Sequence, residues 1–140
     1  MAITRREFIQ SAVAACGFSG CSPNTEQSRI LVLGSPEKFV EGDNVLTLER
    51  VLVVRRGNEF RALSILCTHQ PCVVEKVADG EFFCPCHGSR FDADGKVTLG
   101  PASKDLPWFK ISLNSDGKLV ADLNESVNAD FAFRLDGVKN

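Results

Sequence analysis

The feature that most constrains this chain is a pair of short segments near its middle that carry cysteine and histidine. The first reads C-T-H-Q-P-C from Cys67 to Cys72, and the second reads C-P-C-H-G-S-R-F from Cys84 to Phe91. Both histidines of the protein and four of its six cysteines lie in these two segments. We therefore expect the rest of the chain to be a scaffold that supports one site.

Each segment offers one cysteine and one histidine at close spacing. These are Cys67 with His69 in the first segment and Cys84 with His87 in the second. Thiolate and imidazole ligands suit either a tetrahedral zinc ion or a [2Fe-2S] cluster of mixed ligation. A zinc finger usually keeps its two cysteines on one arm and its two histidines on the other, whereas each arm here has one of each and a further cysteine. The ligand types alone leave both metal centres open.

The two segments resemble the cluster-binding loops of Rieske iron-sulfur proteins, in the disulfide-containing, high-potential branch of that family. The similarity extends over residues 44–123 and includes Gly100-Pro101-Ala102, which is similar to the proline loop that covers the cluster in the family. The resemblance implies a [2Fe-2S] cofactor and one-electron transfer. It also implies an all-β Rieske fold, namely an antiparallel β-sandwich with a small cluster-binding subdomain.

The resemblance further implies a role for individual residues. Two cysteines would bind the buried iron, two histidines would bind the outer iron, two further cysteines would form a disulfide, and one serine would donate a hydrogen bond to a bridging sulfide. In that order, these residues are Cys67 and Cys84, His69 and His87, Cys72 and Cys86, and Ser89.

Three positions depart from the family pattern. Pro71 stands where members usually have glycine, so the first loop loses one amide donor and has one fixed φ angle. Gln70 replaces the leucine that packs between cluster and quinone in quinol-oxidising members, which argues against direct quinol contact. Phe91 replaces a tyrosine whose hydroxyl bonds a ligand sulfur, and the chain contains no tyrosine. Because hydrogen bonds to the sulfurs raise the potential, we expect a value below that of the quinol-oxidising relatives.

The pattern of apolar residues predicts strands throughout the chain. The run Val51–Val54 is typical of a buried strand, and Asp-Gly turns recur at 79–80, 94–95 and 116–117. Short strands separated by such turns favour a single all-β domain of sandwich or barrel type. The expected strands cover residues 29–34, 45–48, 51–54, 59–65, 73–77, 81–83, 96–99, 108–113 and 118–123.

The N-terminal residues 1–21 resemble an export signal. Thr4–Ile9 is similar to the twin-arginine motif, and a short apolar stretch follows it. Cys21 ends a segment that resembles a lipoprotein processing site, so it is the candidate for lipidation. The alternatives are an amphipathic N-terminal helix and unmodified cysteines in a discarded peptide. We expect a periplasmic protein, anchored as a lipoprotein if Cys21 is modified, with a linker and first strand at 22–43.

The C-terminal extension, residues 124–140, lies beyond the similarity. Phe131, Phe133 and Leu135 alternate with smaller or polar residues. This pattern favours an extra strand packed on the domain over a partner-binding tail, because three large apolar side chains would otherwise be exposed.

Three functions agree with these features. The favoured function is one-electron transfer by an exported redox protein or a subunit of a respiratory or oxidase complex, with a cytochrome or an oxidase subunit as partner. The alternatives are the Rieske subunit of a quinol-oxidising cytochrome bc-type complex and, in a different class, a structural zinc-binding module. The net charge of −2 implies no basic surface for nucleic acid, and no motif indicates a substrate site of the chain's own.

Overall fold

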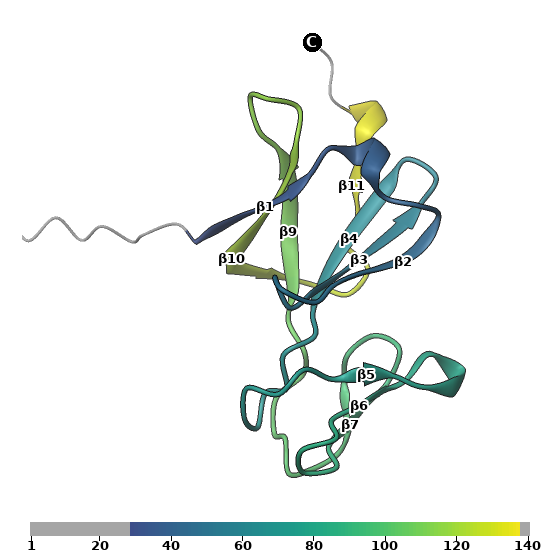
Figure 1. The fold of residues 1–140 in the computed structure, drawn as a ribbon, viewed down its shortest axis with the longest axis vertical. Helices are drawn as coiled ribbons and strands as arrows, with labels where there is room; N and C mark the ends of the chain where they lie inside the picture. Colours follow the sequence, from purple (N-terminus) through teal and green to yellow (C-terminus); the bar gives the residue numbers. More distant parts are fainter. Residues whose placement is uncertain (1–28, 138–140) are drawn as a thin grey trace, which may run out of the picture.

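The computed structural model describes residues 29–137 of the chain, and these residues form two antiparallel β-sheets. In Figure 1 the large sheet lies above the small one, and extended segments connect them. The expectation of an all-β Rieske fold with a separate small subdomain is confirmed. Among residues 29–137, no helix is long and apolar enough to cross a membrane. The predicted export signal and Cys21, the candidate for lipidation, lie outside the described residues.

The large sheet has seven strands in the order β1-β10-β9-β4-β3-β2, and β11 pairs with β4 beside this path. Its strands are β1 (Ile30–Gly34), β2 (Gly42–Leu46), β3 (Val51–Arg56), β4 (Glu59–Ser64), β9 (Trp108–Leu113), β10 (Leu119–Val127) and β11 (Phe133–Arg134).

The small sheet has four short strands in the order β5-β6-β7-β8. They are β5 (Glu75–Lys76), β6 (Phe82–Phe83), β7 (Arg90–Phe91) and β8 (Val97–Leu99). The sequence pattern did not predict β7, because its two residues end the second cysteine-bearing segment and show no alternation. Nearby, the predicted strand at 73–77 is shorter in the structure, where only residues 75–76 are in β5.

Strand β3 is apolar on both faces because it contributes to two hydrophobic cores. Val51 and Val53 lie in the base core, which is formed by strands of the large sheet, β1 among them, and by the segment around Phe39. Leu52 and Val54 point the other way, into the junction core between the two sheets. Successive side chains of a strand point to opposite faces, so an uninterrupted apolar run is what this position requires.

The junction core contains the two cysteines that the sequence proposed as iron ligands. Buried Cys67 and Cys84 pack there with Leu63, Phe82 and Trp108, among other residues. The candidate site is therefore continuous with the packing that joins the sheets.

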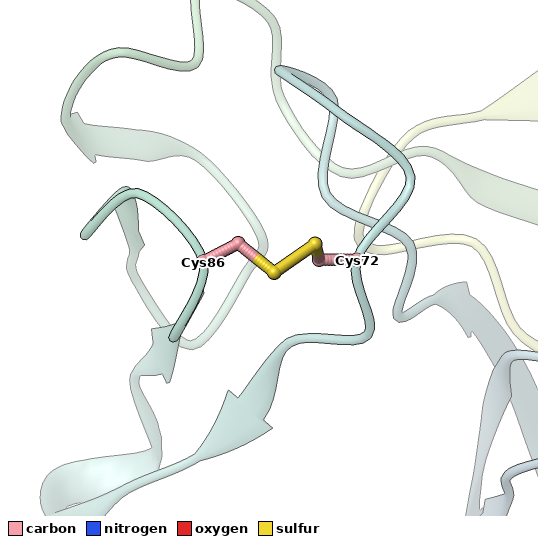
Figure 2. Close-up of a disulfide and its surroundings, with 2 residues drawn as sticks. All are labelled: Cys72 and Cys86. Carbon is pink, nitrogen blue, oxygen red and sulfur yellow. A yellow bond between two sulfur atoms is a disulfide. The ribbon is translucent and has the colours of Figure 1, made fainter.

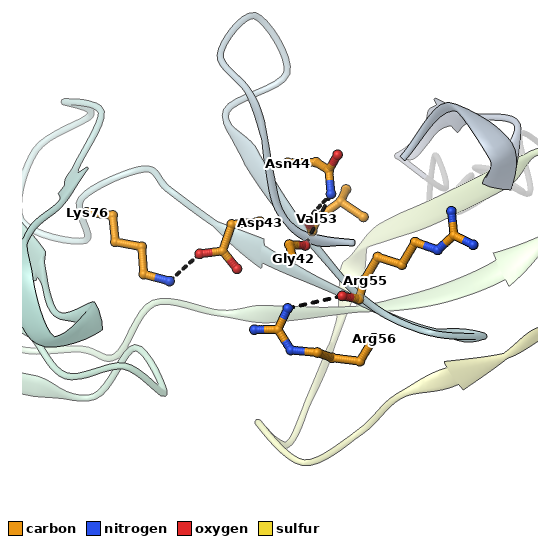
Figure 3. Close-up of polar contacts among 7 residues, drawn as sticks. All are labelled: Gly42, Asp43, Asn44, Val53, Arg55, Arg56 and Lys76. Carbon is orange, nitrogen blue, oxygen red and sulfur yellow. Dashed lines mark hydrogen bonds and ion pairs between the residues drawn. The ribbon is translucent and has the colours of Figure 1, made fainter. Parts of the chain in front are cut away.

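Polar contacts also join the two sheets. The indole Nε1 of Trp108 donates a hydrogen bond of 2.7 Å to the carbonyl oxygen of Asp94. On another side of the junction, Lys76 of β5 forms an ion pair with Asp43 of β2, as Figure 3 shows. Contacts at two separate points restrict rotation of one sheet against the other.

Two loops use the same turn, which the sequence repeats as D-A-D-G-K at 92–96 and N-S-D-G-K at 114–118. In each, the side-chain oxygen of the first residue accepts backbone N–H bonds from the third and fifth residues, at 2.9 to 3.0 Å. The glycines have positive φ angles, +82° for Gly95 and +71° for Gly117. The turns differ in surroundings, because Gly95 is buried and packs against Leu106 whereas Gly117 has nothing within 4 Å.

The C-terminal extension forms a packed strand, as the alternating pattern favoured. Phe133 pairs with Phe60 of β4, and both Phe133 and Leu135 pack against the base core. Phe131 is partly buried before this strand. Strands β1 and β11, which lie outside residues 44–123, thus both belong to the large sheet.

The two similar turns allow the energetic cost of overpacking to be measured separately from the cost of backbone strain. A Gly95→Ala substitution places a Cβ within 3.1 Å of the Leu106 Cβ and 3.2 Å of the Leu63 Cδ1, whereas Gly117→Ala meets no atom. We expect Gly117→Ala to cost about 1–2 kcal/mol for its left-handed backbone. Gly95→Ala should cost roughly 1–3 kcal/mol more because of overpacking. Guanidinium unfolding curves of the two variants measure the difference, and equal losses would contradict the tight junction.

Candidate metal centre

The first loop, residues 66–73, is closed at its base by backbone pairing. Leu66 and Val73 form an isolated antiparallel bridge, and the Cys67 N–H donates to the Cys72 carbonyl oxygen at 2.8 Å. Cys67 is only 5% exposed, whereas His69 lies at the surface. The loop therefore places a thiol inside and an imidazole outside.

The second loop, residues 84–89, has the same arrangement. The Cys84 N–H donates to the Ser89 carbonyl oxygen at 2.8 Å, and the Gly88 N–H donates to the Cys84 carbonyl oxygen at 2.9 Å. Gly88 has a φ of +81°, a conformation that side chains rarely adopt, so glycine suits the turn. Cys84 is 1% exposed and His87 is exposed.

The structure brings the four predicted donors together as two pairs. The Cys67 and Cys84 side chains are hydrogen-bonded partners in the junction core. The rings of His69 and His87 lie side by side, with 4.8 Å between centroids and an interplanar angle of 85°. The arrangement has a buried sulfur layer and an exposed imidazole layer.

A disulfide joins the two loops, with the pairing that the family resemblance implied. Cys72 and Cys86 have an S–S distance of 2.04 Å and a Cα–Cα distance of 6.5 Å (Figure 2). The sulfur of Cys84 lies within 4.8 Å of both disulfide sulfurs. This three-sulfur group is not a free ligand set, because two of its members are already bonded to each other. The cysteines available to a metal among the described residues are Cys67 and Cys84.

Ser89 connects the second loop to the proline loop and to a ligand candidate. It is fully buried, and its Oγ accepts a hydrogen bond of 3.0 Å from the Ala102 backbone N–H. Its hydroxyl also hydrogen-bonds the sulfur of Cys67. The resemblance implied a bond to a bridging sulfide, and the contact with the cysteine sulfur places the hydroxyl in the same sulfur layer.

Thr68 connects the first loop to the proline loop, a role that sequence reasoning missed. Its Oγ1 donates a hydrogen bond of 2.5 Å to the Lys104 carbonyl oxygen. The only signal in the sequence is a hydroxyl residue between Cys67 and His69, and nothing there names its partner 36 residues away. Both cysteine-bearing loops are thus bonded to the segment that contains Gly100 and Pro101.

The two buried thiols differ in acidity. Burial by itself raises the pKa of Cys67, but hydrogen bonds from the His69 and Gln70 N–H groups, the Cys84 thiol and the Ser89 hydroxyl outweigh it, and the net pKa is lowered. Burial raises the pKa of Cys84, and the neighbouring Cys67 adds to the rise. Cys67 therefore loses its proton first, and the hydrogen bonds that favour its thiolate also suit a sulfur that ligates a metal.

The donor set fits a [2Fe-2S] cluster of mixed ligation. Two thiol sulfurs side by side suit one iron, and two imidazoles side by side suit the other. The sulfurs are buried and the rings are exposed, so the donors form two layers that match the two irons of such a cluster.

The model of the Rieske [2Fe-2S] domain family matches residues 29–110 of this chain. The protein therefore belongs to the Rieske [2Fe-2S] family, and its cofactor is a [2Fe-2S] cluster. The structural zinc-binding module, the alternative from another class, has no support from this match.

Two similar proteins are named as subunits of a cytochrome complex. The cytochrome b6-f complex iron-sulfur subunit of Chlorobaculum thiosulfatiphilum is 35% identical over 74 residues, which are 52% of this chain and 41% of that protein. The subunit of the same name from Prochlorococcus marinus strain SARG is 32% identical over 126 residues, 88% of this chain and 64% of that protein. The chain thus spans less than two thirds of the length of these relatives.

A solved structure is also similar. It is the crystal structure of the cyanobacterial plasma membrane Rieske protein PetC3 from Synechocystis PCC 6803, with 33% sequence identity and a TM-score of 0.44. The match covers 66% of this chain and 98% of that one.

Removal of the Ser89 hydroxyl should affect both stability and potential. Ser89→Ala leaves the buried Ala102 N–H without an acceptor, which should cost about 1–3 kcal/mol of unfolding free energy. It also removes a hydrogen bond to the sulfur layer, so the reduction potential should fall. Denaturant unfolding and protein-film voltammetry measure the two effects. Ser103→Ala, an exposed neighbour, is the control, and the same potential in both variants would contradict the role of Ser89.

Proposed function

We propose that this protein transfers single electrons through a [2Fe-2S] cluster whose inner iron is bound by Cys67 and Cys84 and whose outer iron is bound by His69 and His87. The observation that carries the proposal is the pair of buried, adjacent thiols beneath two exposed imidazoles 4.8 Å apart. When bound, such a cluster accepts and releases one electron. The chain thus supplies an electron-transfer centre.

Different residues stabilise different parts of this centre. The two buried cysteines keep water from the inner side, and the Cys72–Cys86 disulfide holds the loops at a fixed separation. His69 and His87 lie at the surface, so a partner can approach the imidazole side closely. Their neutral rings in place of thiolates reduce the negative charge at the outer iron, which favours a potential in the range of about −150 to +300 mV.

The setting that we propose is the periplasm, with export through the twin-arginine motif at Thr4–Ile9. A lipid on Cys21 would attach the protein to the membrane, and the partner would be a cytochrome or an oxidase subunit. This part rests on the sequence motif, and on relatives that are named as subunits of a cytochrome complex.

A second candidate is the Rieske subunit of a quinol-oxidising cytochrome complex. The names of the relatives favour it. Gln70 argues against direct quinol contact, because it is an exposed polar residue where the quinol-oxidising members have leucine. We therefore rank the general electron-transfer role first.

The cluster itself can be tested by spectroscopy. We expect the reduced protein to give a rhombic EPR signal with a low average g value, together with two irons per chain. A Cys67→Ser variant should lose the signal because a buried thiolate is removed from the inner iron. Ser112→Ala, an exposed position on β9 outside the two loops, should keep it. EPR silence with one bound zinc per chain would end the redox proposal.

A tyrosine at position 91 should supply the hydroxyl group that Phe91 lacks. Phe91 is fully buried in the junction core with Cys67 and Cys84. If Phe91→Tyr places a hydroxyl on a ligand sulfur as in high-potential members, the reduction potential should rise. Protein-film voltammetry on wild type and variant measures the change. Phe83→Tyr on β6 is the control, and no rise with Phe91→Tyr would count against the proposed source of an intermediate potential.

A further inference from the structure

A cavity of about 590 Å³ lies away from the two cluster-binding loops and has walls from three separate parts of the chain. Arg61 of β4 forms one wall. Asp94 and Lys96, in the turn between β7 and β8, form the second. The third is residues 128–130, which follow β10 in the C-terminal extension. The cavity therefore exists only because the large sheet, the small subdomain and the extension meet.

Arg61 has no anionic partner within the described residues. No hydrogen bond or ion pair reaches its guanidinium there, and its buried Nε is without an acceptor. Its guanidinium carbon lies 4.1 Å from the centre of the Trp108 ring, a cation–π contact. Trp108 is itself held by the hydrogen bond from its Nε1 to the Asp94 carbonyl oxygen. The cation is thus fixed on a rigid surface.

The chemistry of Arg61 indicates what the cavity can bind. A half-buried guanidinium loses hydration, and an oxyanion that accepts from its terminal Nη groups compensates for this loss, although the buried Nε is out of its reach. Lys96 adds a second positive charge, whereas Asp94 and Asp130 add two negative charges. Among residues 29–137, none of these four charged side chains forms an ion pair with another. A singly charged, planar anion meets the need of Arg61 with the least repulsion from the two aspartates.

We propose that this cavity binds a small free carboxylic acid, as its carboxylate, on the guanidinium of Arg61. Lys96 strengthens the binding by electrostatic attraction. The carboxylates of Asp94 and Asp130 repel multiply charged anions more strongly than singly charged ones. The ring of Trp108 backs the Arg61 cation. The site does not depend on the cluster, and it assigns a function to residues 128–130 of the C-terminal extension.

The single tryptophan of the chain makes the binding measurable. Sodium acetate is titrated into the full-length, cluster-loaded protein while Trp108 emission is followed, with sodium chloride at matched ionic strength as reference. We expect a saturable change with acetate and none with chloride. Arg61→Gln should abolish the change, and Arg56→Gln, an exposed arginine outside the cavity, should keep it.

Two exposed positions test the charge balance without disturbing the core. Lys96→Gln should weaken acetate binding by about two- to five-fold, and Asp130→Asn should strengthen it by a similar factor. Wild-type protein should bind sulfate more weakly than acetate. The proposal is overturned by a non-saturable acetate response, by an unchanged response in Arg61→Gln, or by charge variants that shift affinity in the opposite directions.

A final experiment distinguishes a free carboxylic acid from the carboxylate of an acidic side chain in a partner protein. The probe is a short peptide with blocked ends that contains one glutamate. We expect it to bind more weakly than acetate because the residues flanking the glutamate must also fit between walls that come from three segments of the chain. Tighter binding of the peptide would assign the carboxylate to a protein partner and overturn the small-molecule proposal.

Discussion

The Cys72–Cys86 disulfide is the constraint on which the metal centre depends. The first loop lies between β4 and β5 and the second between β6 and β7, so the two short strands β5 and β6 separate them along the chain. A covalent bond between them keeps Cys67 beside Cys84 and His69 beside His87 without relying on packing alone. Backbone pairing at the base of each loop then sets the side-chain directions. The proline loop completes the arrangement, because the Thr68 hydroxyl donates to the Lys104 carbonyl oxygen and the Ser89 Oγ accepts from the Ala102 N–H.

The site is also rigid because its buried half belongs to the packing between the sheets. Strands β3 and β4 contribute alternate side chains to the base core and the junction core, so the large sheet supports both. Cys67 and Cys84 are members of the junction core. Any change that loosens the junction therefore also moves these two proposed ligands. This coupling explains why a domain with only short strands around its metal centre can hold the donors in place.

Much of the fold and of the site could be predicted from the sequence. The Asp-Gly turns marked the hairpins, and the run from Val51 to Val54 marked a buried strand, because both signals depend on local backbone and side-chain preferences. Other features could not be predicted. β7 has two residues without alternation, and the partner of Thr68 lies 36 residues away. The alternation of Phe131, Phe133 and Leu135 indicated a strand, but its pairing with β4 depends on the folded sheet.

The sequence by itself determined the donor set, since two cysteines and two histidines limit the metal centre to a zinc ion or a [2Fe-2S] cluster of mixed ligation, and the resemblance of the two segments to Rieske loops favoured the cluster. It also determined which loops carry them. Only the tertiary structure decided that the sulfurs are buried and the imidazoles exposed, because burial depends on segments packed from elsewhere in the chain. The tertiary structure also decided that Arg61 has no anionic partner within residues 29–137 and lines a cavity, because ion pairs depend on distance in space and not on spacing in the sequence.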